Sequence, residues 1–194
     1  MTKNATIEIT RRQLLKTSGF LSVAGVAALT GGSILTLPGQ AFSADPSADL
    51  GILNVALGLE HEGIAAYQLG AESKLLKPNV LKVAVKFQDD HKAHRDLLAS
   101  AIKKMGGTPV AAKTQAEYAK SLNAASLKSQ NDVLELAARL ELGAVTAYLG
   151  VIPSFADREL AKVSGRLAAD ETLHWTTLNS DLGLPFPKAM FFGS

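Results

Sequence analysis

The sequence predicts an all-α protein, in which two antiparallel helix hairpins are joined by a long crossover into a four-helix bundle. Its composition is 47% hydrophobic and only 6% aromatic, with abundant Ala and Leu, which favours packed helices over a sheet. Four long stretches carry apolar residues at helical spacing, and one pair of these stretches resembles the other. A chain of 194 residues is long enough for one such domain.

The first two helices are predicted over roughly residues 49–73 and 80–105. In the first, apolar residues share the helical face of Glu60. The second follows a short break at Lys77-Pro78-Asn79, because proline suits an early helical position. It stops at Gly106-Gly107, since glycine is the usual residue just past a helix end.

The third and fourth helices repeat this arrangement. Asn131 and Asp132 are both plausible N-caps for the third helix, which continues to about Gly150. Asp157 marks the start of the fourth, which continues to about Leu182.

The links between these helices differ in length. The outer two are short, so each helix pair must form an antiparallel hairpin. The middle link spans residues 106–130 and includes a predicted short helix at 114–122. A link of this length allows the second hairpin to cross over rather than continue a simple up-down bundle. Residues 183–194 form an apolar tail, which we expect to pack on the bundle or on another subunit of a homo-oligomer.

The N-terminal residues predict an exported protein. Arg11-Arg12, followed by two leucines and a lysine, resembles a twin-arginine signal, and residues 17–40 are uncharged. Small residues near position 41 suit cleavage, so residues 1–44 are interpreted as a signal peptide and 45–194 as the mature domain. We therefore expect recognition by the twin-arginine export machinery and a periplasmic or otherwise exported location. The alternative is an uncleaved membrane anchor, because the apolar run is long enough to span a bilayer.

Charge and cysteine content narrow the function. Residues 1–44 hold four basic residues and one acidic residue, so the remainder carries 16 Lys and Arg against 17 Asp and Glu. Such a domain has no basic stripe, which argues against a nucleic-acid partner. The sequence has no cysteine, and this excludes disulfides, iron–sulfur clusters and a cysteine nucleophile. Any metal ion must therefore be held by nitrogen and oxygen atoms.

A carboxylate and a histidine recur at matching places in the two predicted hairpins. Glu60 and His94 are 34 residues apart, and Glu141 and His174 are 33 apart. All four histidines of the chain lie inside the repeated segments. A repeated Glu…His pattern is what a metal site in the centre of a four-helix bundle requires.

The second and fourth helices each carry a pair of ionisable residues one turn apart on an otherwise apolar face. Burying these groups without compensation would cost several kcal/mol per charge, and a cation among them removes that cost. The candidate metal ligands are Glu60, His91, His94, Glu141, Glu171 and His174. The sequence identifies no catalytic residue and no site for an organic cofactor.

Residues 50–182 resemble the ferritin-like superfamily, the di-iron or di-manganese carboxylate bundles that include rubrerythrin and bacterioferritin. In that family the first and third helices each supply a Glu, and the second and fourth each supply Glu-x-x-His. Glu60 and Glu141 match the single glutamates, and Glu171 with His174 matches the last motif. The chain also resembles exported ferritin-like proteins of bacteria. This resemblance implies one or two Fe or Mn ions and chemistry with dioxygen or peroxide, of a ferroxidase or peroxidase kind.

The second helix departs from the family pattern. His91 stands where the family has a Glu, so three carboxylates would face two divalent ions and leave one positive charge uncompensated. The second ion should then bind more weakly, unless Asp90 or Asp170 turns inward. A single ion, or two loosely held ions, fits this ligand set better than a tightly bridged pair.

Several residues near the motifs have simpler interpretations. His61 and Glu62 lie on other helical faces and are expected at the surface or beside the site, with Glu62 the runner-up to Glu60. Tyr67 and Tyr148 are expected to be core residues. The competing hypothesis for the whole protein is a metal-free structural or stress-related envelope protein on the same bundle.

Overall fold

The computed structural model of the chain describes residues 46–185. The predicted signal peptide at 1–44, its cleavage site and the tail after Pro185 lie outside the described residues.

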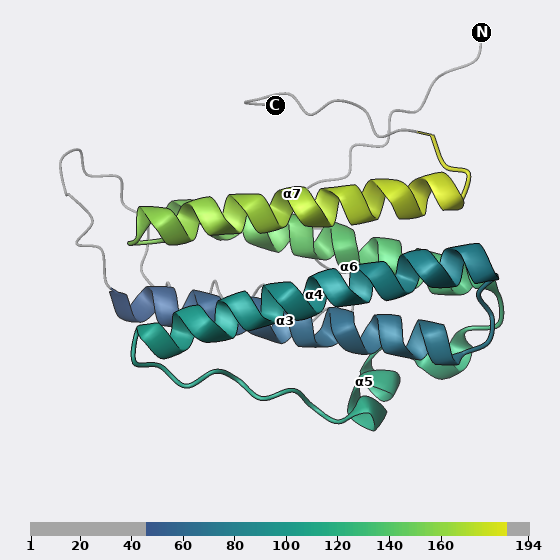
Figure 1. Cartoon of the computed structure of the whole chain (residues 1–194), viewed down its shortest axis with the longest axis horizontal. Coiled ribbons are helices and arrows are strands. Elements are labelled where there is room, and N and C mark those ends of the chain that lie inside the picture. Colours follow the sequence, from purple (N-terminus) through teal and green to yellow (C-terminus); the bar gives the residue numbers. More distant parts are fainter. Residues whose placement is uncertain (1–45, 186–194) are drawn as a thin grey trace, which may run out of the picture. The chain divides into compact units, whose positions relative to one another are not determined.

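Four long helices form two antiparallel hairpins (Figure 1). The first hairpin pairs α3 (Pro46–Glu72) with α4 (Pro78–Lys104), and the second pairs α6 (Gln130–Val151) with α7 (Arg158–Asp181). Helix α3 also packs against α6, and α4 against α7. The described part of the chain is therefore a four-helix bundle, and the all-α prediction is confirmed.

The crossover between the hairpins contains α5 (Gln115–Ser121) and a 3-10 turn, η1 (Ala124–Ser126). A second 3-10 turn, η2 (Ile152–Ser154), lies in the short link from α6 to α7. Helix α5 packs on α3, where Tyr118 is buried in a small apolar cluster (Figure 1). The predicted short helix is thus confirmed, and it anchors the crossover to the first hairpin.

Helices α4 and α7 end in the same way. Gly106 and Gly183 follow the two helices with φ of 79° and 71°, a left-handed conformation that glycine adopts without steric cost. The backbone then folds back: Gly107 N–H donates to Ile102 O at 2.9 Å, and Leu184 N–H donates to Asn179 O at 2.9 Å. These bonds satisfy carbonyl groups that a helix end leaves without partners.

The start of α6 differs from the prediction. Its N-cap is Ser129, and not Asn131 or Asp132. The side chain of Ser129 accepts from Asp132 N–H, while Asp132 accepts from Ser129 N–H at 2.9 Å. This reciprocal pair makes Asp132 the third helical residue, because a capping box needs a hydroxyl three positions before its acid. The predicted start of α7 is confirmed, since Asp157 is its N-cap and accepts from Glu159 N–H at 2.7 Å.

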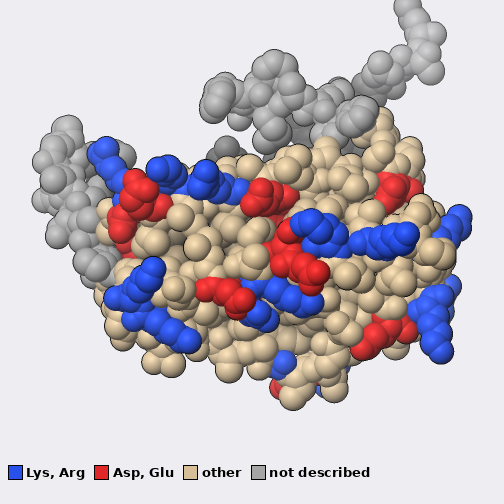
Figure 2. Space-filling model, in the orientation of Figure 1, with Lys and Arg blue, Asp and Glu red and all other residues tan. Residues whose placement is uncertain are grey.

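The core of the bundle has an apolar cluster toward each end and polar side chains between them. One cluster gathers around Leu57, Leu98 and Ile102, and the other around Leu134 and Leu178. The outer face over α4 and α7 instead carries basic and acidic side chains side by side (Figure 2). The apolar clusters therefore separate the polar centre from the two ends of the bundle.

Asp49 joins the start of α3 to the start of α7. Its carboxylate is 1% exposed, and it accepts from Ala156 N–H at 2.8 Å and from Asp157 N–H at 3.0 Å. These two N–H groups precede α7 and have no partner inside that helix. The contact spans the two hairpins, and sequence inspection did not single it out.

Replacing Asp49 by Ala should destabilise the protein by about 2 kcal/mol, because two part-buried N–H groups would lose their acceptor. The free energy of unfolding in urea would show the loss. Asp96→Ala is a matched control, since this carboxylate is 70% exposed and pairs only with its neighbour Arg95. The control should change stability by less than about 0.5 kcal/mol. Equal effects of the two substitutions would contradict the role of Asp49.

Candidate metal centre

Six ionisable side chains meet in the middle of the bundle, and all four long helices contribute. They are Glu60 on α3, His91 and His94 on α4, Glu141 on α6, and Glu171 and His174 on α7. None of the six is more than 8% exposed. The structure thus brings together every candidate ligand that the sequence indicated.

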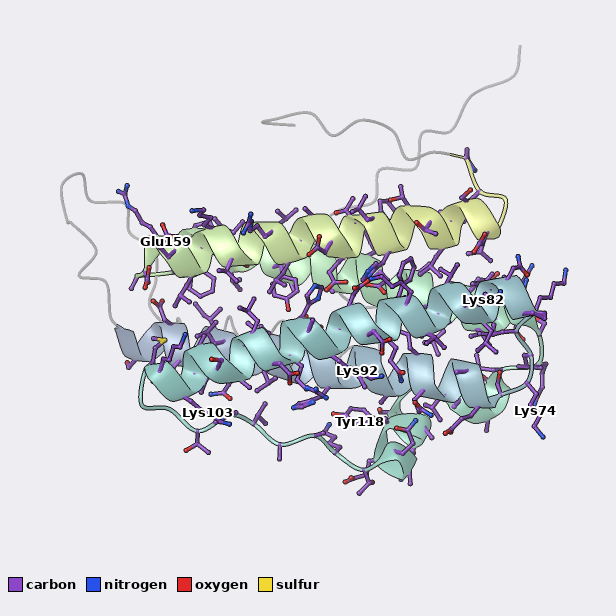
Figure 3. All side chains as sticks on the ribbon, viewed as in Figure 1. Lys74, Lys82, Lys92, Lys103, Tyr118 and Glu159 are labelled. Carbon is purple, nitrogen blue, oxygen red and sulfur yellow. The ribbon has the colours of Figure 1, made fainter. Side chains whose placement is uncertain are left out.

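The lengths and directions of the helices place these side chains at one level. Each of the four helices has 22 to 27 residues and carries its candidate metal ligands near its middle. In Figure 3, Lys82 near the start of α4 lies at the opposite end of the bundle from Lys103 and from Glu159, near the start of α7. Because neighbouring helices are antiparallel, the midpoints of the helices coincide.

The first donor set comprises Glu60, His91, His94 and Glu171. His91 Nδ1 lies 2.8 Å from Glu60 Oε2, and His94 Nδ1 lies 3.1 Å from Glu171 Oε1. The longer separations are 3.7 Å between His94 Nδ1 and Glu60 Oε2 and 3.8 Å between His91 Nδ1 and Glu171 Oε1. All four atoms therefore face a common point.

The second donor set comprises His91, Glu141, Glu171 and His174. His91 Nε2 lies 3.2 Å from Glu141 Oε1, and His174 Nδ1 lies 3.0 Å from Glu171 Oε2. His174 Nδ1 is also 3.5 Å from Glu141 Oε1. The two sets share Glu171, whose two oxygen atoms face different sets, and they share His91 in the same way.

Two aspartates contact the outer nitrogen of the histidine on the facing helix. Asp90 Oδ2 on α4 lies 3.4 Å from His174 Nε2 on α7, and Asp170 Oδ2 on α7 lies 3.4 Å from His94 Nε2 on α4. Neither aspartate enters a donor set, so neither supplies the additional inward acid considered above. Both instead orient the imidazoles so that Nδ1 points inward, as carboxylates behind ligating histidines do.

Two tyrosines donate hydrogen bonds to the single glutamates. Tyr67 on α3 donates to Glu141 on α6, and Tyr148 on α6 donates to Glu60 on α3. Both rings are buried, as expected for core residues, but the prediction missed their hydroxyl contacts. Burial and the nearby carboxylates raise the pKa of both tyrosines well above 10. The signal in the sequence is their equal spacing, since each tyrosine follows its repeat's glutamate by seven residues.

The nearby carboxylates favour the protonated forms of His94 and His174. Burial alone lowers the pKa of an imidazole, because it disfavours the charged form. For His94, hydrogen bonds to Glu171 and Glu60 outweigh burial and raise the pKa to about 10. For His174, hydrogen bonds to Glu141 and Glu171 raise the pKa to about 9 despite burial.

The pKa of His91 and the pKa values of Glu60 and Glu141 shift in opposite directions. Burial lowers the pKa of His91, but its hydrogen bonds to Glu141 and Glu60 outweigh burial and raise the pKa well above 6.5. Burial raises the pKa of Glu60 and Glu141, yet hydrogen bonds from the histidines reverse this and lower both values. Three imidazolium groups can therefore balance three carboxylates when no cation is bound.

Two observations test whether a metal ion fits among these residues. Glu141 Oε2 is buried and has no hydrogen-bond partner among the described residues, a state that costs about 1–3 kcal/mol. A cation would remove that cost. In addition, the ligand atoms of each donor set lie within 4.8 Å of one another. Carboxylate and imidazole donors without sulfur suit iron, manganese or zinc, so the residues fit a metal ion.

The neighbours of Glu60 lie outside both donor sets. Glu62 is half-buried, and burial raises its pKa while Lys113 partly offsets the rise. His61 Nε2 lies 3.1 Å from Val110 O, so the ring fastens the crossover to α3. The structure therefore places Glu60, and not the runner-up Glu62, in the centre.

The fold and the site together define a four-helix bundle with a buried carboxylate–histidine centre. Residues 48–184 match the family model described as a ferritin-like domain. The chain therefore belongs to the ferritin-like family. No curated protein matches the sequence.

Solved structures show the same fold. A conserved hypothetical protein from Mycobacterium tuberculosis is 25% identical, with a TM-score of 0.61 over 75% of this chain and 98% of that one. A dodecameric thioferritin, the bacterioferritin-related protein from Bacteroides fragilis, is 18% identical, with a TM-score of 0.61 over 84% and 94% of the two chains. A ferritin-like, diiron-carboxylate protein from Bacillus anthracis is 23% identical, with a TM-score of 0.55 over 69% and 94%.

The raised pKa values predict that the metal-free protein loses stability in alkali. Free imidazoles titrate near pH 6.5, whereas the pKa is about 10 for His94 and about 9 for His174 in the folded protein. A histidine whose pKa is raised in the folded protein stabilises the fold fully below pH 6.5. This stabilisation declines as the pH rises and is lost once the pH passes the pKa of the folded state. The Tm after chelation should thus fall between pH 7 and pH 10, and it should fall less in His94→Gln. A constant Tm over this range would contradict the assignment.

Proposed function

We propose that this protein binds iron or manganese in the centre of the bundle and uses it in reactions with dioxygen or peroxide. The observation that carries the proposal is the pair of donor sets, which hold six buried ligating side chains and share Glu171 and His91. Nitrogen and oxygen donors favour iron or manganese, with zinc as the alternative. One or two ions per chain are expected, because the two donor sets overlap.

A bound iron or manganese ion would supply one-electron redox exchange. The residues of the chain position that ion and protect it. Tyr67 and Tyr148 hold one oxygen of Glu141 and Glu60 respectively, which fixes how each carboxylate faces the centre. The apolar clusters at both ends of the bundle exclude water from the centre. The reaction class is ferrous oxidation, peroxide removal or metal handling, and the family relation to diiron-carboxylate proteins supports it.

We further propose that the protein is exported through the twin-arginine pathway and acts in the periplasm or outside the cell. Arg11-Arg12 and the uncharged run at 17–40 support this proposal. Export of a folded protein suits a centre whose ligands come from four different helices, because the ligands are assembled only after folding.

Self-association is also proposed. Val55 on α3 and Leu142 and Leu149 on α6 are 42%, 42% and 53% exposed, and residues 142–156 contain no charged side chain. An uncharged outer face suits contact with another subunit. The related Bacteroides fragilis protein is described as dodecameric, which supports an oligomer in this family.

A metal-free structural protein is the second candidate function. The observation in its favour is the hydrogen-bonded balance of three histidines and three glutamates. Metal analysis separates the two candidates, since a structural core holds no ion.

Protein purified from an iron- and manganese-replete host should contain one or two ions per chain by mass spectrometry. Glu141→Ala and His174→Ala should lose the ion held by the second donor set, because each removes a ligand of that set. Glu141→Gln retains the size of the side chain and separates loss of charge from loss of packing. Glu62→Ala is the control and should retain the metal, as Glu62 lies outside both sets. Metal-free wild-type protein with variants of equal stability would sink the metal proposal and favour the structural one.

Replacing Arg11-Arg12 by Lys-Lys should stop export, because the pathway recognises the arginine pair and not its charge. Cell fractionation and the mass of the exported product would measure the change. Replacement of Lys3 by Arg is a matched control and should leave export intact. Equal export of the Lys-Lys variant would show that another route is used.

A further inference from the structure

Both ring nitrogens of His91 point at candidate metal positions. Nδ1 lies 2.8 Å from Glu60 Oε2 in the first donor set, and Nε2 lies 3.2 Å from Glu141 Oε1 in the second. The other two ligating histidines behave differently. Each turns Nδ1 toward the centre and Nε2 toward an aspartate outside it, Asp170 for His94 and Asp90 for His174. Only His91 among the three has no nitrogen left for an outer partner.

The helix facing His91 is shaped to hold this ring. A side chain at Gly63 on α3 would place its Cβ 3.1 Å from Cε1, 3.2 Å from Nδ1 and 3.3 Å from Nε2 of His91. Such contacts are tighter than ordinary van der Waals packing, so the ring occupies the space that the missing side chain leaves. The ring of Tyr67 lies beside His91, with the ring centroids 5.4 Å apart. The imidazole is therefore held between the two donor sets rather than free to turn toward one.

The charge balance of the centre also supports a position of His91 between two ions. Glu60, Glu141 and Glu171 supply three negative charges, and two divalent ions supply four positive charges. One uncompensated charge would remain in an interior where burial makes it costly. An imidazole that has lost both N–H protons carries one negative charge and a lone pair on each nitrogen. In that form His91 would bring the ligand charge to four.

We propose that His91 bridges the two metal positions as an imidazolate, with Nδ1 bound to one ion and Nε2 to the other. The inference rests on the proposed function, since it requires two ions. In the first binding step one nitrogen of protonated His91 loses its proton to solvent and donates the freed lone pair to an ion, while the other nitrogen keeps its proton. In the second step the second ion replaces that proton, which leaves to solvent. No electron is transferred in either step.

Co²⁺ is a suitable probe, because it shifts the proton resonances of its histidine ligands far from the rest of the spectrum. The metal-free full chain is titrated with Co²⁺ while NMR records shifted resonances that vanish in D₂O. An exchangeable N–H resonance of His91 should be present with one ion and absent with two. At neutral pH the second ion should release two protons, the last one of His91 and the inward Nδ1 proton of the other histidine in its donor set. The Nε2–H resonances of His94 and His174 should remain, since Asp170 and Asp90 hold them.

The outcomes separate this inference from the proposed function. Two ions with three exchangeable histidine resonances would overturn the bridge alone, because His91 would then bind through one nitrogen. Uptake of a single ion would also overturn the bridge and leave the metal-binding proposal standing. Uptake of no ion would overturn both. His91→Gln should hold the second ion at least about tenfold more weakly, whereas His91→Glu should retain it by restoring the fourth charge.

Two glycines on α3 provide a matched pair that leaves the ligands unchanged. Gly63→Ala should displace the ring of His91 and weaken binding of the second Co²⁺ by about tenfold to hundredfold. Gly58→Ala should leave binding unchanged, because a Cβ there meets nothing within 4 Å. Both substitutions favour the helix equally, so a difference between them reports on the ring. Equal affinities in the two variants would contradict the role given to His91.

Discussion

Neutrality of the buried centre is the constraint on which the rest of the structure depends. Three carboxylates and three imidazoles lie in an interior where an unpaired charge costs several kcal/mol. Protonated histidines can achieve the balance in the absence of a cation, and bound metal ions would displace those protons. The same side chains therefore satisfy two states of the protein. The orphaned Glu141 Oε2 shows that the proton-balanced state leaves one acceptor unused.

The hairpins depend on each other through this centre. Tyr67 and Tyr148 each donate a hydrogen bond to the glutamate of the other hairpin. Asp90 on α4 contacts His174 on α7, and Asp170 on α7 contacts His94 on α4. Asp49 adds a further contact between the start of α3 and the start of α7. Neither hairpin alone supplies partners for all of its buried polar side chains. The site is therefore complete only when the two hairpins have packed together.

The repeat in the chain is broken at one position, and that position has the most chemical consequence. Glu171 on α7 and His91 on α4 occupy equivalent places, and each offers two ligand atoms to two different donor sets. A carboxylate and an imidazole can both join two ions, but they differ in charge and in protons. If the proposed metal binding holds, substitution of one for the other would change how protons accompany it while the bundle around it stays the same. Gly63 supplies the room that the larger ring needs.

The sequence by itself determined the helices, their pairing into hairpins and the six candidate ligands, because helical periodicity and i, i+3 spacing are local properties. Local chemistry was less decisive at α6, where Ser129 displaced the expected caps by forming a reciprocal pair with Asp132. Only the tertiary structure decided that Tyr67 reaches Glu141, 74 residues away, and that the two nitrogens of His91 face different donor sets. Such contacts depend on how four helices are rotated about their axes. No short stretch of sequence encodes that rotation, since it results from the packing of all four helices together.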